Sequence, residues 1–301
     1  MGSFQGPREW GRLLTAMLTP FNPDGSVNAE EVGRIANHLV DDQKNDGLVV
    51  CGTTGESPTL DESEKLRVLE LTLEAVGDRA AVVFGAGTYD TAESVVMARE
   101  AEKRGAHGIM LVNPYYNRPG QAGLYAHFSA VARETTLPVM LYNIQPRTSI
   151  NLETPTLLRL AEIPNVVAVK EASGSMVQIS DVCGAVPDGF RVYSGDDGLT
   201  LPVLSVGGYG IVSVAAHVVG PEIKEMVVAA LGGDPSRART IHHRLAPVFK
   251  ALFSAPSPVP VKYALSKRGF DCARVRLPLV EMNDEEKRVV DRALDGLLSR
   301  V

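Results

Sequence analysis

Reactive side chains occur where apolar runs of the sequence end, and their types are those of carbonyl chemistry. The apolar run 166–169, which contains three β-branched valines, leads into Lys170, and the apolar run 138–141 leads into Tyr142. A lysine amine is a nucleophile that forms a Schiff base with a carbonyl carbon. A tyrosine hydroxyl can move protons to and from such an adduct. The two run ends therefore predict Schiff-base catalysis, provided that the fold brings them together.

Other run ends carry groups that bind carboxylates. A Gly-Thr-Thr-Gly turn at 52–55 offers backbone N–H groups and hydroxyls, and Arg147 could bind a second carboxylate in bidentate fashion. Each feature has a plain alternative: a tight loop, a solvated arginine, a tyrosine in the core, or a lysine that has reached water. Their joint occurrence at the ends of successive runs favours a catalytic site.

Strand and helix patterns alternate along the chain, and this alternation predicts that the residues after the apolar runs lie at the same end of the fold. Between the strands, apolar residues recur at helical spacing, with Asn28 and Asp61 as expected N-caps. Strand–helix alternation implies parallel strands, and eight such units in about 230 residues indicate an α/β (β/α)8 TIM barrel, whose active site lies at the C-terminal strand ends. An open doubly wound sheet is the alternative, but no G-x-G-x-x-G follows the first strand. The strands are expected at 13–18, 47–51, 81–84, 108–112, 138–142, 166–170, 190–193 and 210–214.

The pattern after the eighth strand is helical to the end of the chain. We interpret residues 1–232 as the catalytic barrel and residues 233–301 as a C-terminal helical appendage packed on it. The net charge of -6 provides no basic surface for nucleic acid or an anionic membrane, and no apolar run is long enough to span a bilayer. The N-terminus lacks a signal-peptide pattern. Three dispersed cysteines without metal-ligand spacing favour a reducing, cytoplasmic location and no metal site.

With these residues assembled, the chain resembles the dihydrodipicolinate synthase family of the pyruvate-dependent class I aldolases. The matching segments extend almost from end to end and include LTPFNPDG, GTTGESPTL, PYYNRPGQAGLYAHF, LPVMLYN, VKEASG, YSGDD, GIVSV and PSPVPVKYAL. The resemblance implies condensation of pyruvate with aspartate 4-semialdehyde to 4-hydroxy-tetrahydrodipicolinate, in lysine and diaminopimelate biosynthesis. It implies no cofactor, because the imine nitrogen acts as the electron sink. It also suggests a homotetramer made of two dimers.

The resemblance further implies a set of catalytic residues. Lys170 matches the Schiff-base lysine, and Tyr142 matches the tyrosine beside it that shuttles protons and steers the imine. Thr53 matches the threonine that links this tyrosine to a second one. Tyr116 matches that second tyrosine, which the family supplies across a dimer interface.

Substrate-binding positions carry over in the same way. Thr54 matches the residue that holds the pyruvate carboxylate, Val212 matches a further pyruvate contact, and Gly195 lies nearby. Arg147 matches the arginine that grips the carboxylate of the aldehyde. The proline before it is shifted by one position, to Pro146, so the loop that carries Arg147 is expected to be aimed differently.

Alternative functions remain open at this stage. The first is another pyruvate-dependent enzyme of the same superfamily, an N-acetylneuraminate lyase or a 2-keto-3-deoxy sugar-acid aldolase. The others are a barrel that binds a keto acid without turnover and a sugar-phosphate isomerase, although the late loops lack a Gly-rich phosphate cradle. Lysine-inhibited relatives bind lysine at a dimer interface, and the resemblance places Lys65 there. We therefore predict weak or absent inhibition by lysine.

Overall fold

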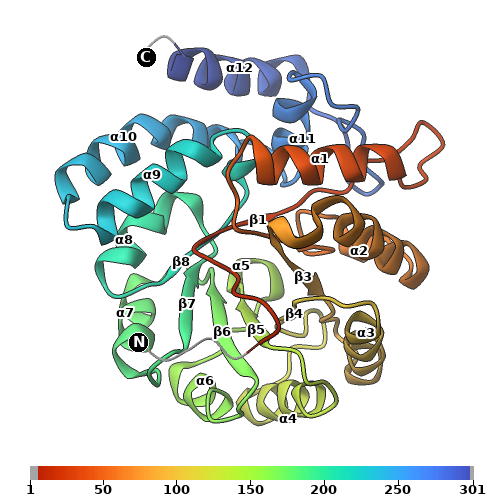
Figure 1. Ribbon diagram of the computed structural model, residues 1–301, viewed down its shortest axis with the longest axis vertical. Coiled ribbons are helices and arrows are strands. Elements are labelled where there is room, and N and C mark those ends of the chain that lie inside the picture. The colour runs from red at the N-terminus through yellow and green to blue at the C-terminus, as the bar shows by residue number, and fades with distance from the viewer. Residues whose placement is uncertain (1–5, 299–301) are drawn as a thin grey trace.

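Eight parallel strands close into a barrel in the computed structural model, which describes residues 6–298 (Figure 1). Each strand pairs with the next in the chain, and the last pairs back with the first through Val212 and Leu14. The predicted TIM barrel is therefore confirmed. The strands are Leu13–Ala16 (β1), Gly47–Val50 (β2), Ala81–Gly85 (β3), Gly108–Val112 (β4), Val139–Asn143 (β5), Val166–Glu171 (β6), Arg191–Ser194 (β7) and Gly210–Ser213 (β8).

Helices cover the outside of the barrel and extend beyond it at one side. Those between strands are Ala29–Asp41 (α1), Glu62–Val76 (α2), Thr91–Lys103 (α3), Gln121–Ala132 (α4), Gln145–Thr148 (α5), Thr154–Leu160 (α6), Met176–Ala185 (α7) and Thr200–Ser205 (α8). Those after β8 are Gly220–Leu231 (α9), Pro235–Ala251 (α10), Val259–Ser266 (α11) and Asp284–Leu298 (α12). No helix within residues 6–298 has both the length and the apolar character needed to cross a membrane.

Both predicted helix caps are present. The side chain of Asn28 accepts a hydrogen bond from the Glu31 N–H at 3.2 Å. Asp61 accepts one from the Glu64 N–H at 2.8 Å, and the Glu64 carboxylate accepts one from the Asp61 N–H at 3.1 Å. Such reciprocal capping satisfies donors that a helix start leaves unpaired, and one cap stabilises a helix by about 1 kcal/mol.

The first strand is shorter than predicted. The expected strand reached residue 18, but β1 ends at Ala16. The N–H of Leu18 donates to Nε2 of His217 at 3.2 Å, and the other ring nitrogen of His217 bonds to the carbonyl of Val214 at 2.8 Å. Because a buried imidazole satisfies this N–H, the chain leaves the sheet early. Burial lowers the pKa of His217 to about 4, so the ring is neutral at pH 7.

Alternation along the strands separates two apolar cores. On β5, Met140 and Tyr142 face the barrel interior, whereas Leu141 packs under the helices. On β6, Ala168 faces the interior and Val169 the helices, so the next residue faces the interior again. Alternation along each strand therefore decides which residues at its end point into the barrel and which point toward the helices.

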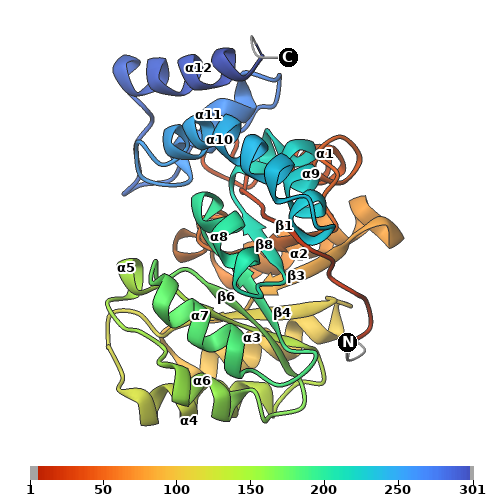
Figure 2. The ribbon, with the colours of Figure 1, turned by 90° about the vertical axis from the view of Figure 1, so that its left-hand side faces the viewer.

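The three helices after α9 gather at one side of the barrel, next to α1 and α9 (Figures 1 and 2). Helix α10 packs along α9 and against α12. One apolar cluster continues from the barrel helices into this region, and it includes Ile223 of α9, Leu245 of α10 and Val290 of α12. The helical C-terminal region is thus packed on the barrel; the division at residue 232 remains a prediction.

Candidate active site

Lys170 and Tyr142 are neighbours at the C-terminal ends of β6 and β5. The two residues are paired in the strand register, and both are buried. Nζ of Lys170 lies 4.2 Å from the centroid of the Tyr142 ring. Within the described part of the chain, Nζ forms no hydrogen bond or ion pair. The predicted nucleophile is therefore held at the inner face of the barrel with its nitrogen uncommitted.

Gly195 packs against the stem of this lysine. A β-carbon at position 195 would lie 3.1 Å from both Cγ and Cε of Lys170 and 2.7 Å from the β-carbon of Ala172. The N–H of Gly195 donates to the carbonyl of Glu171 at 2.8 Å, which holds it beside β6. The absence of a side chain here leaves room for the lysine, which gives the predicted position a physical role.

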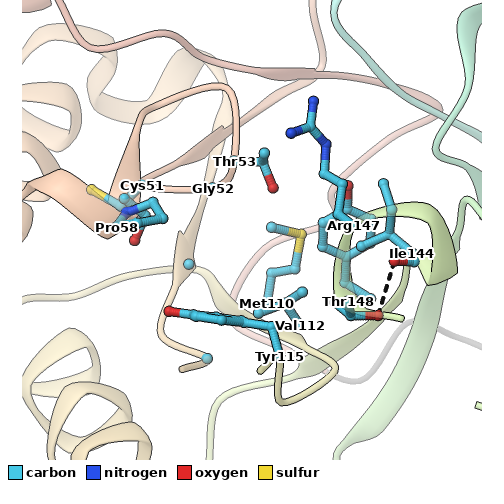
Figure 3. Close-up of a pocket in the computed structure, with 14 residues that line it drawn as sticks. Cys51, Gly52, Thr53, Pro58, Met110, Val112, Tyr115, Ile144, Arg147 and Thr148 are labelled. Atoms are coloured by element: carbon cyan, nitrogen blue, oxygen red, sulfur yellow. Dashed lines mark hydrogen bonds between the residues drawn. The ribbon is translucent and has the colours of Figure 1, made fainter. Parts of the chain in front are cut away.

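A cavity of about 210 Å³ opens at the same end of the barrel (Figure 3). Its wall includes Thr53, Tyr115, Tyr142 and Arg147. The volume suits a molecule smaller than a typical drug-sized ligand. Burial, with the carboxylate of Glu93 nearby, raises the pKa of Tyr115, so its hydroxyl keeps its proton. Cys51 also lines the cavity, but burial raises the pKa of its thiol to about 12, which leaves it inert.

The turn that follows β2 is closed on itself. The N–H groups of Gly55 and Ser57 both donate to the carbonyl of Gly52, at 3.1 and 3.3 Å. Thr53 lines the cavity, and Thr54 is buried beside it in the chain. Neither threonine donates a hydrogen bond from its N–H or hydroxyl to another residue within 6–298. The turn thus presents unpaired donors, as a carboxylate site requires.

Arg147 reaches the cavity from the one-turn helix α5. Pro146 lies in the first turn, where a missing N–H costs no hydrogen bond. The Thr148 hydroxyl donates to the Ile144 carbonyl at 2.9 Å, the dashed bond in Figure 3. The shifted proline therefore builds a helical turn, and Arg147 still lines the cavity. The guanidinium is exposed, and no carboxylate of the described residues pairs with it.

Val212 is the remaining predicted substrate-binding position. It lies in the interior cluster with Tyr142 and does not itself line the cavity. Asp197, which the sequence reasoning did not select, joins the ends of β7 and β8 by accepting hydrogen bonds from the Ser213 hydroxyl and from the N–H groups of Val214 and Ala215. Burial raises the pKa of the Asp197 carboxyl above its usual range.

Tyr116 stands apart from the other predicted residues. It is 93% exposed with a backbone φ of 68°, and it does not line the cavity of its own chain. Tyr115, its neighbour, takes the place in the wall and meets Tyr89 edge-to-face, with ring centroids 5.3 Å apart. A single chain thus places Lys170 against Tyr142, and Tyr142 and Thr53 in the same cavity wall, but leaves Tyr116 in solvent.

A polar layer behind the strand ends was missed from the sequence. Asn143 and Glu171 follow Tyr142 and Lys170, so they face outward. The Asn143 amide donates to the Glu171 carboxylate at 3.1 Å, and its oxygen accepts from Asn113 at 2.8 Å. It also accepts from the Leu152 N–H at 2.9 Å, which anchors the segment after α5. The available signal was a second polar residue after each apolar run, at Asn143 and at Glu171.

Comparison with known proteins identifies the family. The chain matches the Dihydrodipicolinate synthetase family model over residues 9–297. A 4-hydroxy-tetrahydrodipicolinate synthase of Moorella thermoacetica is 54% identical, with 96% of this chain and 100% of the relative covered. A dihydrodipicolinate synthase crystal structure from Bacillus anthracis is 42% identical, with a TM-score of 0.93 and 95% and 98% of the two chains covered. One from Cyanidioschyzon merolae with lysine bound is 41% identical, with a TM-score of 0.94 and coverage of 96% and 98%. The chain therefore belongs to the dihydrodipicolinate synthetase family.

Proposed function

We propose that this protein condenses pyruvate with aspartate 4-semialdehyde to 4-hydroxy-tetrahydrodipicolinate through a Schiff base on Lys170. The observation that carries the proposal is the buried, uncommitted amine of Lys170 against the ring of Tyr142, at the strand ends where the cavity opens. The names of the similar proteins support this reaction over the sugar-acid aldolases of the same superfamily.

Pyruvate enters first in this mechanism. The amine of Lys170 attacks the keto carbon, and loss of water gives the imine. The unpaired donors of the Thr53-Thr54 turn hold the carboxylate, while Val212 and Gly195 bound the small keto acid. Loss of a methyl proton then gives an enamine, with the imine nitrogen taking up the electron pair. Tyr142 moves the protons of these steps, because it lies beside the nitrogen and lines the cavity.

The aldehyde enters second. The enamine carbon attacks the aldehyde carbon of aspartate 4-semialdehyde, and the new carbon–carbon bond leaves a hydroxyl. The amine of this substrate then attacks the imine carbon, which releases Lys170 and closes the ring. Arg147 binds the carboxylate of the incoming aldehyde, since its guanidinium lies at the cavity wall without a carboxylate partner among the described residues.

The proposal includes an assembly and a location. Tyr116 completes the proton relay through Thr53 in the site of a partner subunit, which accounts for an exposed tyrosine next to a cavity-lining one. The protein acts as a homotetramer of two such dimers in the cytoplasm.

Borohydride reduction with pyruvate tests the chemistry directly. Intact mass and peptide mapping should find a pyruvyl adduct on Lys170, and a parallel assay should show turnover with aspartate 4-semialdehyde. An adduct without turnover of this aldehyde would retain the Schiff base and overturn the substrate assignment. No adduct, or an adduct on another lysine, would overturn the proposed mechanism. Faster cleavage of sialic acid or a keto-deoxy gluconate would instead establish the sugar-acid alternative.

A further inference from the structure

A buried ion pair joins the C-terminal region to the turn that follows β2. Lys262 on α11 is fully buried and Glu56 is 3% exposed, and the Lys262 ammonium pairs with Oε1 of Glu56. Nζ of Lys262 also donates to the carbonyl of Arg274 at 2.6 Å and lies 4.3 Å from the centroid of the Phe21 ring. The partners are 206 positions apart in the chain. Because a buried charge is costly unless paired, neither partner tolerates loss of the other.

The carboxylate of Glu56 is held from a second side by the same region. Its Oε2 accepts a hydrogen bond from the backbone N–H of Arg276 at 3.0 Å. The guanidinium of Arg276 continues past Glu56 and donates to the carbonyl of Thr59 and to the carboxylate of Glu64. Both oxygens of Glu56 are thus engaged by residues that follow the barrel in the chain.

Glu56 ends the turn that presents Thr53 and Thr54. Its backbone is left-handed, with φ of 55°, and its N–H donates to the carbonyl of Thr53 at 3.1 Å. A non-glycine residue in this conformation persists only where its surroundings hold it. The adjacent Gly55 carbonyl accepts from the Thr19 hydroxyl at 2.8 Å. The ion pair therefore fixes the closing residue of a turn whose two threonines carry the free donors.

We propose that Lys262 is a positioning residue for the keto-acid half of the reaction: through Glu56 it holds the Thr53-Thr54 turn in the shape that binds the pyruvate carboxylate. This role rests on the proposed function. In this arrangement the C-terminal region is part of the active-site scaffold. Lys262 touches neither substrate, and its effect reaches pyruvate only through the turn.

The test compares Lys262→Met with the double variant Glu56→Gln/Lys262→Met. The single variant leaves a buried carboxylate facing one backbone N–H, so the turn must relax toward water. The pyruvate concentration that half-saturates borohydride trapping, and the KM for pyruvate, should rise about tenfold or more, while the KM for aspartate 4-semialdehyde stays within about threefold. The double variant keeps an acceptor for Arg276 without a buried charge and should recover most of the pyruvate affinity.

Glu64→Gln is the matched control. It breaks an ion pair between the same C-terminal segment and the barrel, but on helix α2 rather than on the turn. It should lower Tm without changing half-saturation by pyruvate. If Lys262→Met fails to fold, Glu56→Gln replaces it, and a selective rise of the pyruvate KM is again expected.

Two negative results would have different meanings. A wild-type protein that forms no pyruvyl adduct would overturn the proposed function, and the positioning role with it. A wild-type adduct together with a Lys262→Met variant, or Glu56→Gln in its place, that loses stability but keeps its pyruvate half-saturation would overturn the positioning role alone.

Discussion

Gly195 lies so close to Lys170 that a β-carbon there would sit 3.1 Å from two carbons of the lysine stem. This contact is tighter than ordinary van der Waals packing, and the same β-carbon would lie only 2.7 Å from the β-carbon of Ala172, which has no flexible side chain that could give way. The lysine stem, and with it the reactive nitrogen, therefore keeps its position only because residue 195, at the end of the neighbouring strand β7, has no side chain.

Replacing this glycine should impair adduct formation. We expect Gly195→Ala to slow borohydride trapping by pyruvate about tenfold or more, because a small displacement of a nucleophile has a large effect on rate. Gly184→Ala on α7 is the control, since a β-carbon there meets no atom within 4 Å. Equal trapping rates for wild type and Gly195→Ala would show that the lysine stem adjusts without loss.

Arg147 should determine the affinity for aspartate 4-semialdehyde and leave adduct formation with pyruvate unaffected. Loss of a charge-assisted bidentate interaction costs about 1.5–3 kcal/mol, or roughly 10- to 100-fold in affinity. Arg147→Met should therefore raise the KM for aspartate 4-semialdehyde by that factor while pyruvate trapping stays at the wild-type rate. The control is Arg159→Met, because Arg159 stacks on Tyr125 away from the cavity. A matching loss of pyruvate trapping would contradict this division.

Tyr116 should act in the site of a neighbouring subunit. Tyr116→Phe and Lys170→Ala are each expected to lower kcat strongly. Mixed assemblies of the two variants should regain activity, because a chain with intact Lys170 then borrows Tyr116 from its partner. Differently tagged, co-expressed subunits allow the hybrids to be isolated and assayed. If purified hybrids have no higher kcat than the two parent variants, or if a monomer is fully active, Tyr116 takes no part in the proton relay.

His217 should make stability depend on pH. Its pKa is lowered from 6.5 to about 4, so as pH falls through this interval the unfolded chain binds a proton that the folded protein does not. Its contribution is present above pH 6.5 and declines toward pH 4, by about 3 kcal/mol in the free energy of unfolding. Urea titrations between pH 4 and 6.5 give the free energy of unfolding as a function of pH. In His217→Gln the slope of this plot should fall by the amount that corresponds to about one bound proton. An unchanged slope would refute the assignment.

Inhibition by lysine should be weak. Lys65 is 7% exposed, and its ammonium lies 3.8 Å from the carboxylate of Glu93, next to the Tyr89–Tyr115 contact. A second ammonium entering beside it meets a like charge and a carboxylate already engaged. Lys65→Ala should increase sensitivity by freeing Glu93. Half-inhibition of the wild type by submillimolar lysine in the condensation assay would contradict the prediction.

The inward-facing half of the site could be predicted from the sequence, and the loops could not. Continuous apolar runs alternating with helical patterns marked the strands, so Tyr142 and Lys170 could be placed at one end of the barrel, where the structure pairs them. The helical turn around Pro146 and the left-handed backbone of Tyr116 lie in connecting segments, where the apolar pattern that marks strands and helices gives no signal. The pairing of Glu56 with Lys262 was hidden for another reason: charged residues are usually exposed, and both are buried.

Alternation gives β5 and β6 two separable duties. Tyr142 and Lys170 turn inward to the reactive centre, while the next residues, Asn143 and Glu171, turn outward and anchor the segment after α5. To change which aldehyde is accepted, the side chains of residues 144–150 can therefore be varied, while Asn151, which accepts a hydrogen bond from Asn143, is kept. Lys170 and Tyr142 face the opposite side of the sheet and can stay unchanged in such a redesign.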